Sequence, residues 1–193
     1  MPDKKKYIET TWYGRGGQGA ITASQLVAEA AYTEGYKGIT TAPSFGAERR
    51  GAPVAAFLRL SSEPIRIFSQ IYDPDIVVVL DPTLLPVLDL KSKYRKDTVI
   101  IINSTKNPEE LGLGHFNKIG IADITKVALE NNLTQSGVAI LNTPIIGAYV
   151  KVTGIIGLAS VEKAINKKFS GDKAAVNMLT AQIVHDITIV YNQ

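Results

Sequence analysis

The spacing of apolar positions along the chain predicts alternating strands and helices. Continuous apolar or β-branched runs at 7–13, 75–80 and 98–102 are typical of strands, and the last two have the composition of parallel strands buried on both faces. From 20 to 34, helix formers place small and apolar residues on one face, which predicts a helix that lies close against a sheet and ends at Gly35. Further strands are predicted at 36–43 and 118–122, and further helices begin near residues 83, 123, 143, 160 and 172.

Three local patterns refine this order of elements. Residues 52–60 and 64–68 are strand-like and are joined by a short polar turn, which predicts an antiparallel hairpin. Thr143 places a capping hydroxyl directly before Pro144, a residue suited to the first helical turn. In the last helix, spacings of three and four define an apolar stripe that leaves His185 on the other side, as a solvent or interface histidine. The stripe consists of Val176, Leu179, Ile183, Ile187 and Val190.

Length and composition limit the number of domains. The chain has 193 residues, of which 45% are hydrophobic and 20% charged, and it shows no internal repeat or low-complexity linker. These features predict one globular domain over residues 1–193. Its expected fold is α/β: a mixed, mostly parallel sheet flanked by helices, with a glycine-rich loop after the first strand.

Charge and residue counts exclude several classes of function. The chain has no cysteine and two histidines, so it offers no thiolate nucleophile, Cys-ligated zinc or Cys-held iron-sulfur cluster, and no His-rich metal site. The net charge is +3, which three lysines at positions 4–6 account for, and no basic stripe with interleaved aromatics predicts nucleic-acid binding. The longest uncharged stretch, 131–150, is too polar for a membrane span, and the N-terminus has no signal-peptide pattern. We therefore expect a cytoplasmic protein that binds neither nucleic acid nor membrane.

The first candidate site is the loop Gly14-Arg15-Gly16-Gly17-Gln18-Gly19, which lies between a predicted strand and a predicted helix. Glycines allow close approach of a ligand, and the helix N-terminus offers free N–H groups to a phosphate or pyrophosphate. A dinucleotide fold would also supply an acidic residue after the second strand, but residues 36–43 contain none, which argues against NAD or FAD. The glycines could also serve only a tight strand-to-helix turn.

The second candidate site is the segment 44–51, Ser44-Phe45-Gly46-Ala47-Glu48-Arg49-Arg50-Gly51, which follows the predicted second strand. Arg49 and Arg50, with Glu48 to orient one of them, can form bidentate contacts with phosphate or carboxylate. A solvated turn and a salt bridge across a subunit interface are the alternatives. Asp81 could be a catalytic carboxylate, but Pro82 and Thr83 after it favour a helix cap.

Three stretches together resemble one family: the glycine-rich loop, the segment 44–54, and the residues Asn142-Thr143-Pro144-Ile145-Ile146-Gly147-Ala148-Tyr149. They are similar to the γ subunits of 2-oxoacid:ferredoxin oxidoreductases, most of all those that act on pyruvate. The resemblance implies a subunit of a complex that converts pyruvate and coenzyme A to acetyl-CoA, carbon dioxide and reduced ferredoxin by oxidative decarboxylation. Complexes acting on 2-oxoisovalerate, 2-oxoglutarate or indolepyruvate, and a purely structural subunit, are the alternatives.

The resemblance also implies how the work is divided between chains. Thiamine diphosphate, magnesium and [4Fe-4S] clusters belong to the α, β and δ partner subunits, ferredoxin interacts through the complex, and this chain alone binds no cofactor and is not catalytic. It is expected to contribute assembly and coenzyme A contacts, with no catalytic residue and no metal ligand. The predicted contact residues are Gly14, Arg15, Gly16, Gly17, Gln18, Gly19, Ser44, Phe45, Gly46, Glu48, Arg49 and Arg50.

Two spatial expectations follow. The two loops should lie side by side at one edge of the sheet, because each follows one of two strands that we expect to be neighbours and parallel. The N–H groups of Gly16 to Gly19 would then meet the pyrophosphate of coenzyme A. We also expect an exposed apolar patch for subunit contacts, at the helix from Thr143 or around Phe45.

Overall fold

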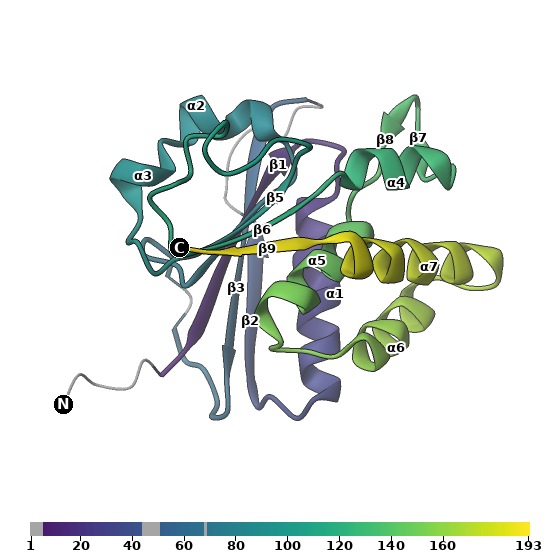
Figure 1. Ribbon diagram of the computed structural model, residues 1–193. Coiled ribbons are helices and arrows are strands. Elements are labelled where there is room, and N and C mark those ends of the chain that lie inside the picture. Colours follow the sequence, from purple (N-terminus) through teal and green to yellow (C-terminus); the bar gives the residue numbers. More distant parts are fainter. Residues whose placement is uncertain (1–5, 44–50, 68) are drawn as a thin grey trace.

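The strands and helices of the computed structural model, which describes residues 6–43, 51–67 and 69–193, follow the predicted alternation (Figure 1). The strands are β1 (Ile8–Arg15), β2 (Gly38–Pro43), β3 (Pro53–Ser61), β4 (Ile76–Val79), β5 (Val99–Asn103), β6 (Lys118–Ala122), β7 (Thr134–Gln135), β8 (Val138–Ala139) and β9 (Ile189–Asn192). The helices are α1 (Ala20–Thr33), the 3-10 turn η1 (Pro82–Leu84), α2 (Leu85–Leu88), α3 (Leu90–Lys93), α4 (Ile124–Glu130), α5 (Pro144–Thr153), α6 (Leu158–Lys168) and α7 (Asp172–Ile187).

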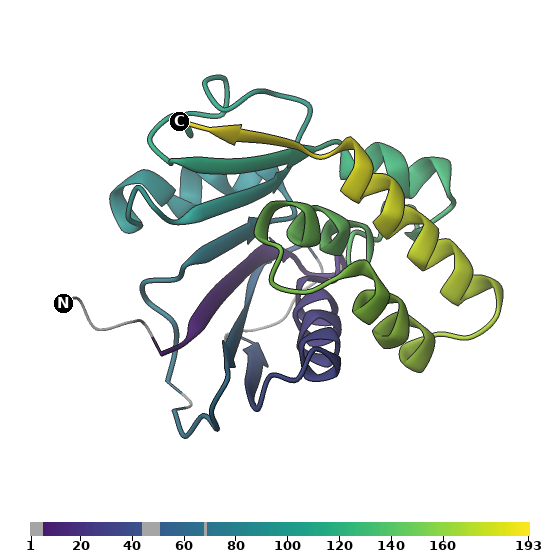
Figure 2. The same cartoon turned by 60° about the horizontal axis from the view of Figure 1, so that its bottom comes forward.

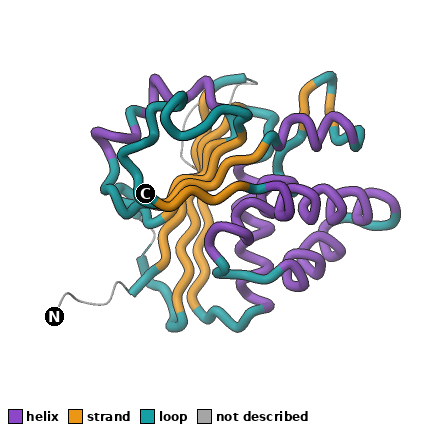
Figure 3. Tube along the Cα trace, in the orientation of Figure 1, coloured by secondary structure: helices purple, strands orange, loops and turns teal. Residues whose placement is uncertain are grey.

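A mixed sheet forms the centre of the molecule, as predicted. In the described part of the chain, seven strands form one sheet in the order β2-β3-β1-β4-β5-β6-β9. Strands β1, β4, β5 and β6 run parallel, whereas β3 is antiparallel to β1 and β2, and β9 is antiparallel to β6. Figure 3 shows the sheet between two layers, with the long helices on one side and short helices and loops on the other.

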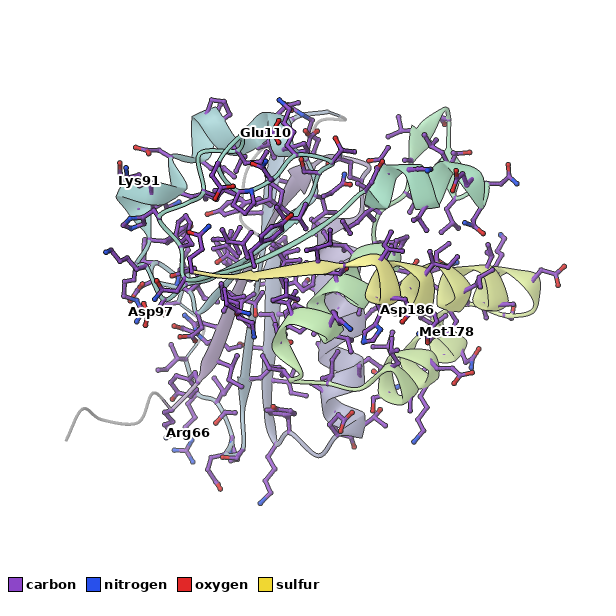
Figure 4. The ribbon with its side chains drawn as sticks, viewed as in Figure 1. Arg66, Lys91, Asp97, Glu110, Met178 and Asp186 are labelled. Atoms are coloured by element: carbon purple, nitrogen blue, oxygen red, sulfur yellow. The ribbon has the colours of Figure 1, made fainter. Side chains whose placement is uncertain are left out.

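Both faces of the sheet are buried, which explains the continuous apolar runs. On the face toward α1, α5 and α6, Val78 and Ile101 join a large core around the stacked rings of Trp12 and Tyr149. On the opposite face, their neighbours along the strands join a smaller core that includes Phe116. Successive residues of a strand point to opposite faces, so a strand covered on both sides needs apolar residues at every position. In Figure 4, the labelled residues Lys91 and Met178 lie on opposite sides of the sheet.

The predicted hairpin between 52–60 and 64–68 is wrong. β3 lies between β1 and β2 and pairs with both, so neither of its edges is free for another strand. Residues 64–67 belong to no strand, and residue 68 lies outside the described ranges. The apolar pattern of 64–68 fits a strand, but the prediction did not account for β2, which already occupies the other edge of β3.

The apolar stripe predicted for the last helix is divided in the structure: Val176 and Ile183 of α7 are partly buried against the core, and Val190 lies in β9. Leu179 and Ile187 of that stripe are 50% and 44% exposed. The buried side of α7 instead carries smaller or polar residues: Ala174, Asn177, Thr180, Ala181 and Val184. The reason lies in α5, which packs between the sheet and α7 (Figure 2). A Cβ at Gly147 would lie 1.9 Å from the carbonyl oxygen of Ala181, so the two backbones approach too closely for large side chains.

The same packing corrects the prediction of an exposed patch on the helix from Thr143. Residues 144–150 of α5 are all buried in this chain, so α5 offers no patch, and Phe45 lies outside the described ranges. The Thr143 hydroxyl does not cap α5 either, because it donates to the side-chain oxygen of Asn177 on α7. The last two helices begin at Leu158 and Asp172, after the N-caps Gly157 and Gly171. At α4, the predicted cap at Asp123 is confirmed, since its carboxylate accepts from the backbone N–H of Lys126.

Candidate functional site

The glycine-rich loop joins β1 to α1 in a backbone conformation that favours glycine. Gly17 and Gly19 have φ angles of 98° and 94°. At Gly19, the N-cap of α1, a Cβ would also lie 2.6 Å from the Cβ of Asn142. At Gly17 a Cβ would meet nothing within 4 Å. Gly19 is therefore fixed by conformation and by contact, whereas Gly17 is fixed by conformation alone.

Hydrogen bonds within the loop use part of its donors. The N–H of Gly16 donates to the carbonyl of Ala52 at 2.8 Å, and that of Gln18 donates to the carbonyl of Arg15 at 3.0 Å. These two of the N–H groups predicted to meet a ligand thus already have protein acceptors. Among the described residues, Gly17 and Gly19 donate to no protein acceptor, and no side chain caps α1. The first turn of α1 keeps the donors and the positive dipole end that attract an anion.

The side chains of the loop turn toward the carboxylate of Asp81, at the end of β4. Arg15 donates through Nε to Oδ2 at 2.9 Å, and Gln18 donates through Nε2 to the same oxygen at 3.1 Å. The other oxygen, Oδ1, accepts from the backbone N–H of Thr83 at 2.9 Å, which confirms Asp81 as the cap of η1. Burial raises the pKa of Asp81, but the bonds from Thr83 and Gln18 and the charge of Arg15 outweigh it, so the pKa lies below its usual value.

A cavity of about 670 Å³ opens beside the loop and the start of α1. Its described lining carries no charged side chain: it consists of Gly16, Gly17, Gly19, Ala20, Ile21, Thr22, Val54, Gln135, Ser136, Ile140, Asn142 and Phe169. The volume falls in the range of small-molecule sites. The cavity combines an apolar wall with backbone donors at a helix N-terminus, which suits a ligand with both an apolar part and an anionic part.

The predicted site residues have separate outcomes. Gly16, Gly17 and Gly19 line the cavity. Gly14 lies within β1, and the side chains of Arg15 and Gln18 bond Asp81. The other predicted residues lie outside the described ranges: Ser44, Phe45, Gly46, Glu48, Arg49 and Arg50.

The end of the second candidate segment does lie beside the glycine-rich loop. Gly51 donates its N–H to the carbonyl of Gly16 at 3.1 Å, and Arg15 donates through Nη1 to the carbonyl of Gly51 at 3.2 Å. The predicted adjacency is thus confirmed at Gly51, but its predicted cause is wrong, because β3 separates β1 from β2. β3 begins at the end of the sheet where β1 ends, since Arg15 pairs with Pro53.

Several lining residues were not predicted. Gln135 ends β7, Ser136 lies in the turn between β7 and β8, and Phe169 follows α6. Nothing in the spacing of apolar positions singles these residues out. Asn142 belongs to a stretch that carried the family resemblance, so a signal existed there, but it did not specify a place beside Gly19.

A second cavity of about 430 Å³ lies at the same edge of the sheet, beyond β4. Hydroxyl and amide side chains line it, among them Thr83, Asn103, Ser104 and Thr125. Asn103 is 5% exposed, and its Oδ1 accepts from the N–H groups of Ile124 and Thr125 at 2.9 and 3.1 Å. Asn103 and Asp123 already satisfy the first turn of α4, so the helix terminus at this cavity offers an anion fewer free backbone donors, although Lys106 also lines it.

Comparison with known proteins identifies the family. The family model described as pyruvate ferredoxin/flavodoxin oxidoreductase matches residues 9–186. The chain belongs to this family. Among family members, the common γ subunit of the pyruvate/ketoisovalerate oxidoreductases of Thermococcus litoralis is 45% identical, over 95% of this chain and 98% of the relative. Pyruvate synthase subunit PorC of Methanocaldococcus jannaschii is 42% identical, over 93% of this chain and 96% of the relative.

A solved structure of a family member supports the fold as well. The crystal structure of pyruvate oxidoreductase subunit PORC from Thermotoga maritima matches with a TM-score of 0.82 and 37% sequence identity, over 96% of this chain and 99% of that one. The predicted family and the predicted α/β fold are thus confirmed. In the described ranges, no helix is both long and apolar enough to cross a membrane.

Proposed function

We propose that this chain is the γ subunit of a pyruvate:ferredoxin oxidoreductase and that it contributes contacts to coenzyme A. The observation that carries the coenzyme A assignment is the uncapped N-terminus of α1, which opens into a cavity of about 670 Å³. Coenzyme A brings a pyrophosphate, a ribose phosphate, an adenine and an extended pantetheine arm. The donors of α1 suit a phosphate, and the apolar wall with Ile21, Ile140 and Phe169 suits an uncharged part of the molecule.

The rest of the reaction is assigned to other chains. Release of carbon dioxide from pyruvate and transfer of the acetyl group to coenzyme A free two electrons, which pass to ferredoxin. The family resemblance implies that thiamine diphosphate, magnesium and [4Fe-4S] clusters would supply that chemistry on the α, β and δ subunits. The absence of cysteine from this chain agrees with that for the clusters. This chain would hold one part of coenzyme A and contact its neighbours. A cytoplasmic location stays a prediction from the sequence.

Arg49 and Arg50 remain predicted coenzyme contacts. They lie outside the described ranges, directly before Gly51, whose N–H donates to the carbonyl of Gly16 in the glycine-rich loop. The described lining of the cavity has no charged side chain, so a cation for the coenzyme phosphates would have to come from elsewhere. The arginine pair is our candidate for it, because guanidinium groups pair well with phosphate.

The name of one relative supports a second 2-oxoacid substrate for the complex. The Thermococcus litoralis protein is named as a subunit common to pyruvate and ketoisovalerate oxidoreductases. A γ subunit that serves two complexes would leave the choice of 2-oxoacid to other chains. We infer that this chain also fits a 2-oxoisovalerate complex, and purification of the native complex followed by assays with both 2-oxoacids distinguishes the two.

The coenzyme A site is tested with a charge placed at Thr22, which lines the cavity at the third position of α1. Thr22→Glu adds an acid where a helix start tolerates or favours it, so folding should not suffer. In the intact complex, repulsion from a bound pyrophosphate should raise the KM for coenzyme A at least about tenfold. Thr22→Gln, of equal size but neutral, should raise it less than about threefold.

The KM for pyruvate serves as the internal control and should stay within about twofold in both Thr22 variants. An unchanged KM for coenzyme A in Thr22→Glu would remove the coenzyme from this cavity. A parallel rise of both Michaelis constants would indicate a damaged interface instead.

A further inference from the structure

The carboxylate of Asp81 lies where the chain changes direction around the sheet. β1 and β4 are parallel neighbours, and Asp81 is two residues past the end of β4. The chain leaves β1 toward α1 on one face and leaves β4 toward η1, α2 and α3 on the other. In open α/β sheets this crevice is where ligands bind. A carboxylate at this point faces the loop on which the proposed coenzyme site depends.

We propose that Asp81 is a positioning residue for coenzyme A: it holds the glycine-rich loop in its binding conformation through Arg15 and Gln18. This inference rests on the proposed function. Asp81 does not itself line the cavity, so it acts through the loop rather than on the ligand. The two carboxylate oxygens of Asp81 have different partners: Oδ1 accepts from Thr83 of η1, and Oδ2 accepts from Arg15 and Gln18 of the loop.

The hydrogen bonds form a closed ring. Asp81 accepts from the Arg15 side chain, and the Arg15 backbone N–H donates to Oε1 of Gln18 at 2.8 Å. The Gln18 amide nitrogen then returns to Asp81. Each member of the ring is held by the other two. The ring therefore fixes the backbone between Arg15 and Gln18 from outside the cavity, and this backbone includes Gly16 and Gly17, which line the cavity.

Arg15 extends this ring to two further segments. Its Nη2 donates to the Thr83 hydroxyl at 2.7 Å, and its Nη1 donates to the carbonyl of Gly51. Arg15 is 34% exposed and Asp81 is 13% exposed, so the pair is partly shielded from solvent. The guanidinium charge is thereby matched inside the protein and is not left for a phosphate. The sequence assigned Arg15 and Gln18 to ligand contact, whereas the geometry points to support of the loop.

If Arg15 instead bound a phosphate of coenzyme A, removal of the Asp81 charge would change the KM for coenzyme A in the opposite direction, so one measurement distinguishes the two roles. If Arg15 were a phosphate ligand restrained by Asp81, removal of the carboxylate charge would free a cation and lower the KM for coenzyme A. If Asp81 positions the loop, the same change disturbs the backbone donors and raises the KM. Asp81→Asn keeps the volume and the oxygen that caps η1, but presents an amide donor to Arg15 and Gln18.

The experiment measures both Michaelis constants and kcat in the intact complex. Asp81→Asn should raise the KM for coenzyme A about tenfold, with kcat and the KM for pyruvate within about twofold. Arg15→Met should act in the same direction. The double variant Asp81→Asn with Arg15→Met should be no worse than the larger single effect, because both changes break one ring. Asp123→Asn is the matched control, an aspartate that caps α4 without contact to the loop, and should change neither KM.

A second, milder variant keeps the proposal testable if Asp81→Asn prevents assembly of the complex. Gln18→Met removes only one bond to the carboxylate and should raise the KM for coenzyme A about threefold. An unchanged or lowered KM in Asp81→Asn and Gln18→Met, or additive effects in the double variant, overturns the positioning role. If Thr22→Glu raises the KM while these variants do not, only this inference fails. If Thr22→Glu also has no effect, the proposed coenzyme site fails and this inference fails with it.

Discussion

The N-termini of α1 and α4 lie at the same edge of the sheet, beside two cavities, but they are satisfied in different ways. At α4, Asp123 caps the N–H of Lys126, and Asn103 accepts from the two preceding N–H groups, those of Ile124 and Thr125. At α1, the N-cap is Gly19, and no side chain of the described residues caps the helix. The difference shows that a helix N-terminus is a useful guide to a ligand only after its caps have been counted.

The two cavities also differ in whether the groups that line them are already hydrogen-bonded within the protein. Several side chains that line the cavity beside α4 bond one another or the backbone, such as Asn103, which donates to the carbonyl of Leu80 at 2.9 Å. The one beside α1 is lined largely by backbone and by apolar side chains. Side chains at α4 stabilise the fold, whereas we propose that the space at α1 holds a ligand. Changes at the two sites should therefore affect different measurements.

The largest expected loss of stability comes from Asn103→Ala. Asn103 is buried and forms four hydrogen bonds, to Leu80, Thr125 and the first turn of α4. Its removal leaves buried donors and acceptors unpaired, which should lower the free energy of unfolding by about 2 to 4 kcal/mol. Urea unfolding of the chain measures the loss. The KM for coenzyme A should stay unchanged in the assembled complex, and a rise would contradict the separation of the two sites.

The second largest effect distinguishes two glycines of the same loop. Gly19→Ala introduces strain at a φ of 94° and a contact with Asn142, so it should lower the free energy of unfolding by about 2 to 3 kcal/mol. Gly17→Ala has similar backbone strain but open space, and it should cost only about 1 kcal/mol. Gly19→Ala should also raise the KM for coenzyme A more. Equal losses of stability would show that the contact with Asn142 relaxes freely.

These comparisons also show how far the sequence could predict the molecule. The parallel strands β4 and β5 were predictable because burial on both faces leaves a continuous apolar run. The glycine-rich loop was predictable because its glycines follow a strand and precede a helix. The insertion of β3 between β1 and β2 was not, because strand order depends on long-range pairing that local patterns do not encode.

The roles of individual side chains were the hardest to predict. Arg15 in a glycine-rich loop resembles a phosphate contact, and only the position of Asp81, 66 residues away, reveals its ion pair. The apolar stripe did not identify the fully buried face of α7 for a similar reason, since the close approach at Gly147 selects small side chains for that face. Both errors arise where a partner distant in sequence decides the role of a residue.

The third prediction concerns pH and the carboxylate of Asp81. Its pKa is lowered in the folded chain because the bonds from Thr83 and Gln18 and the charge of Arg15 outweigh its burial. A lowered pKa contributes stability that is present above the unfolded value, about 3.9, and is lost as the pH falls through the folded value. Asp81→Asn should cost about 1 to 2 kcal/mol at neutral pH. The difference from the unmodified chain should shrink below about pH 4, and a difference that persists there would show that the charge is not responsible.

The smallest predicted effect tests whether the α4 terminus is purely structural. Asp123→Ala removes the cap from Lys126, and loss of an N-cap costs about 1 kcal/mol. The loss should stay this small because Asn103 still satisfies the two preceding N–H groups. Inorganic phosphate should not restore stability to Asp123→Ala, since an uncapped terminus binds an anion only where the neighbouring donors are also free. Thermal unfolding with and without phosphate measures this, and a selective gain for the variant would mean that the α4 terminus can also act as an anion site.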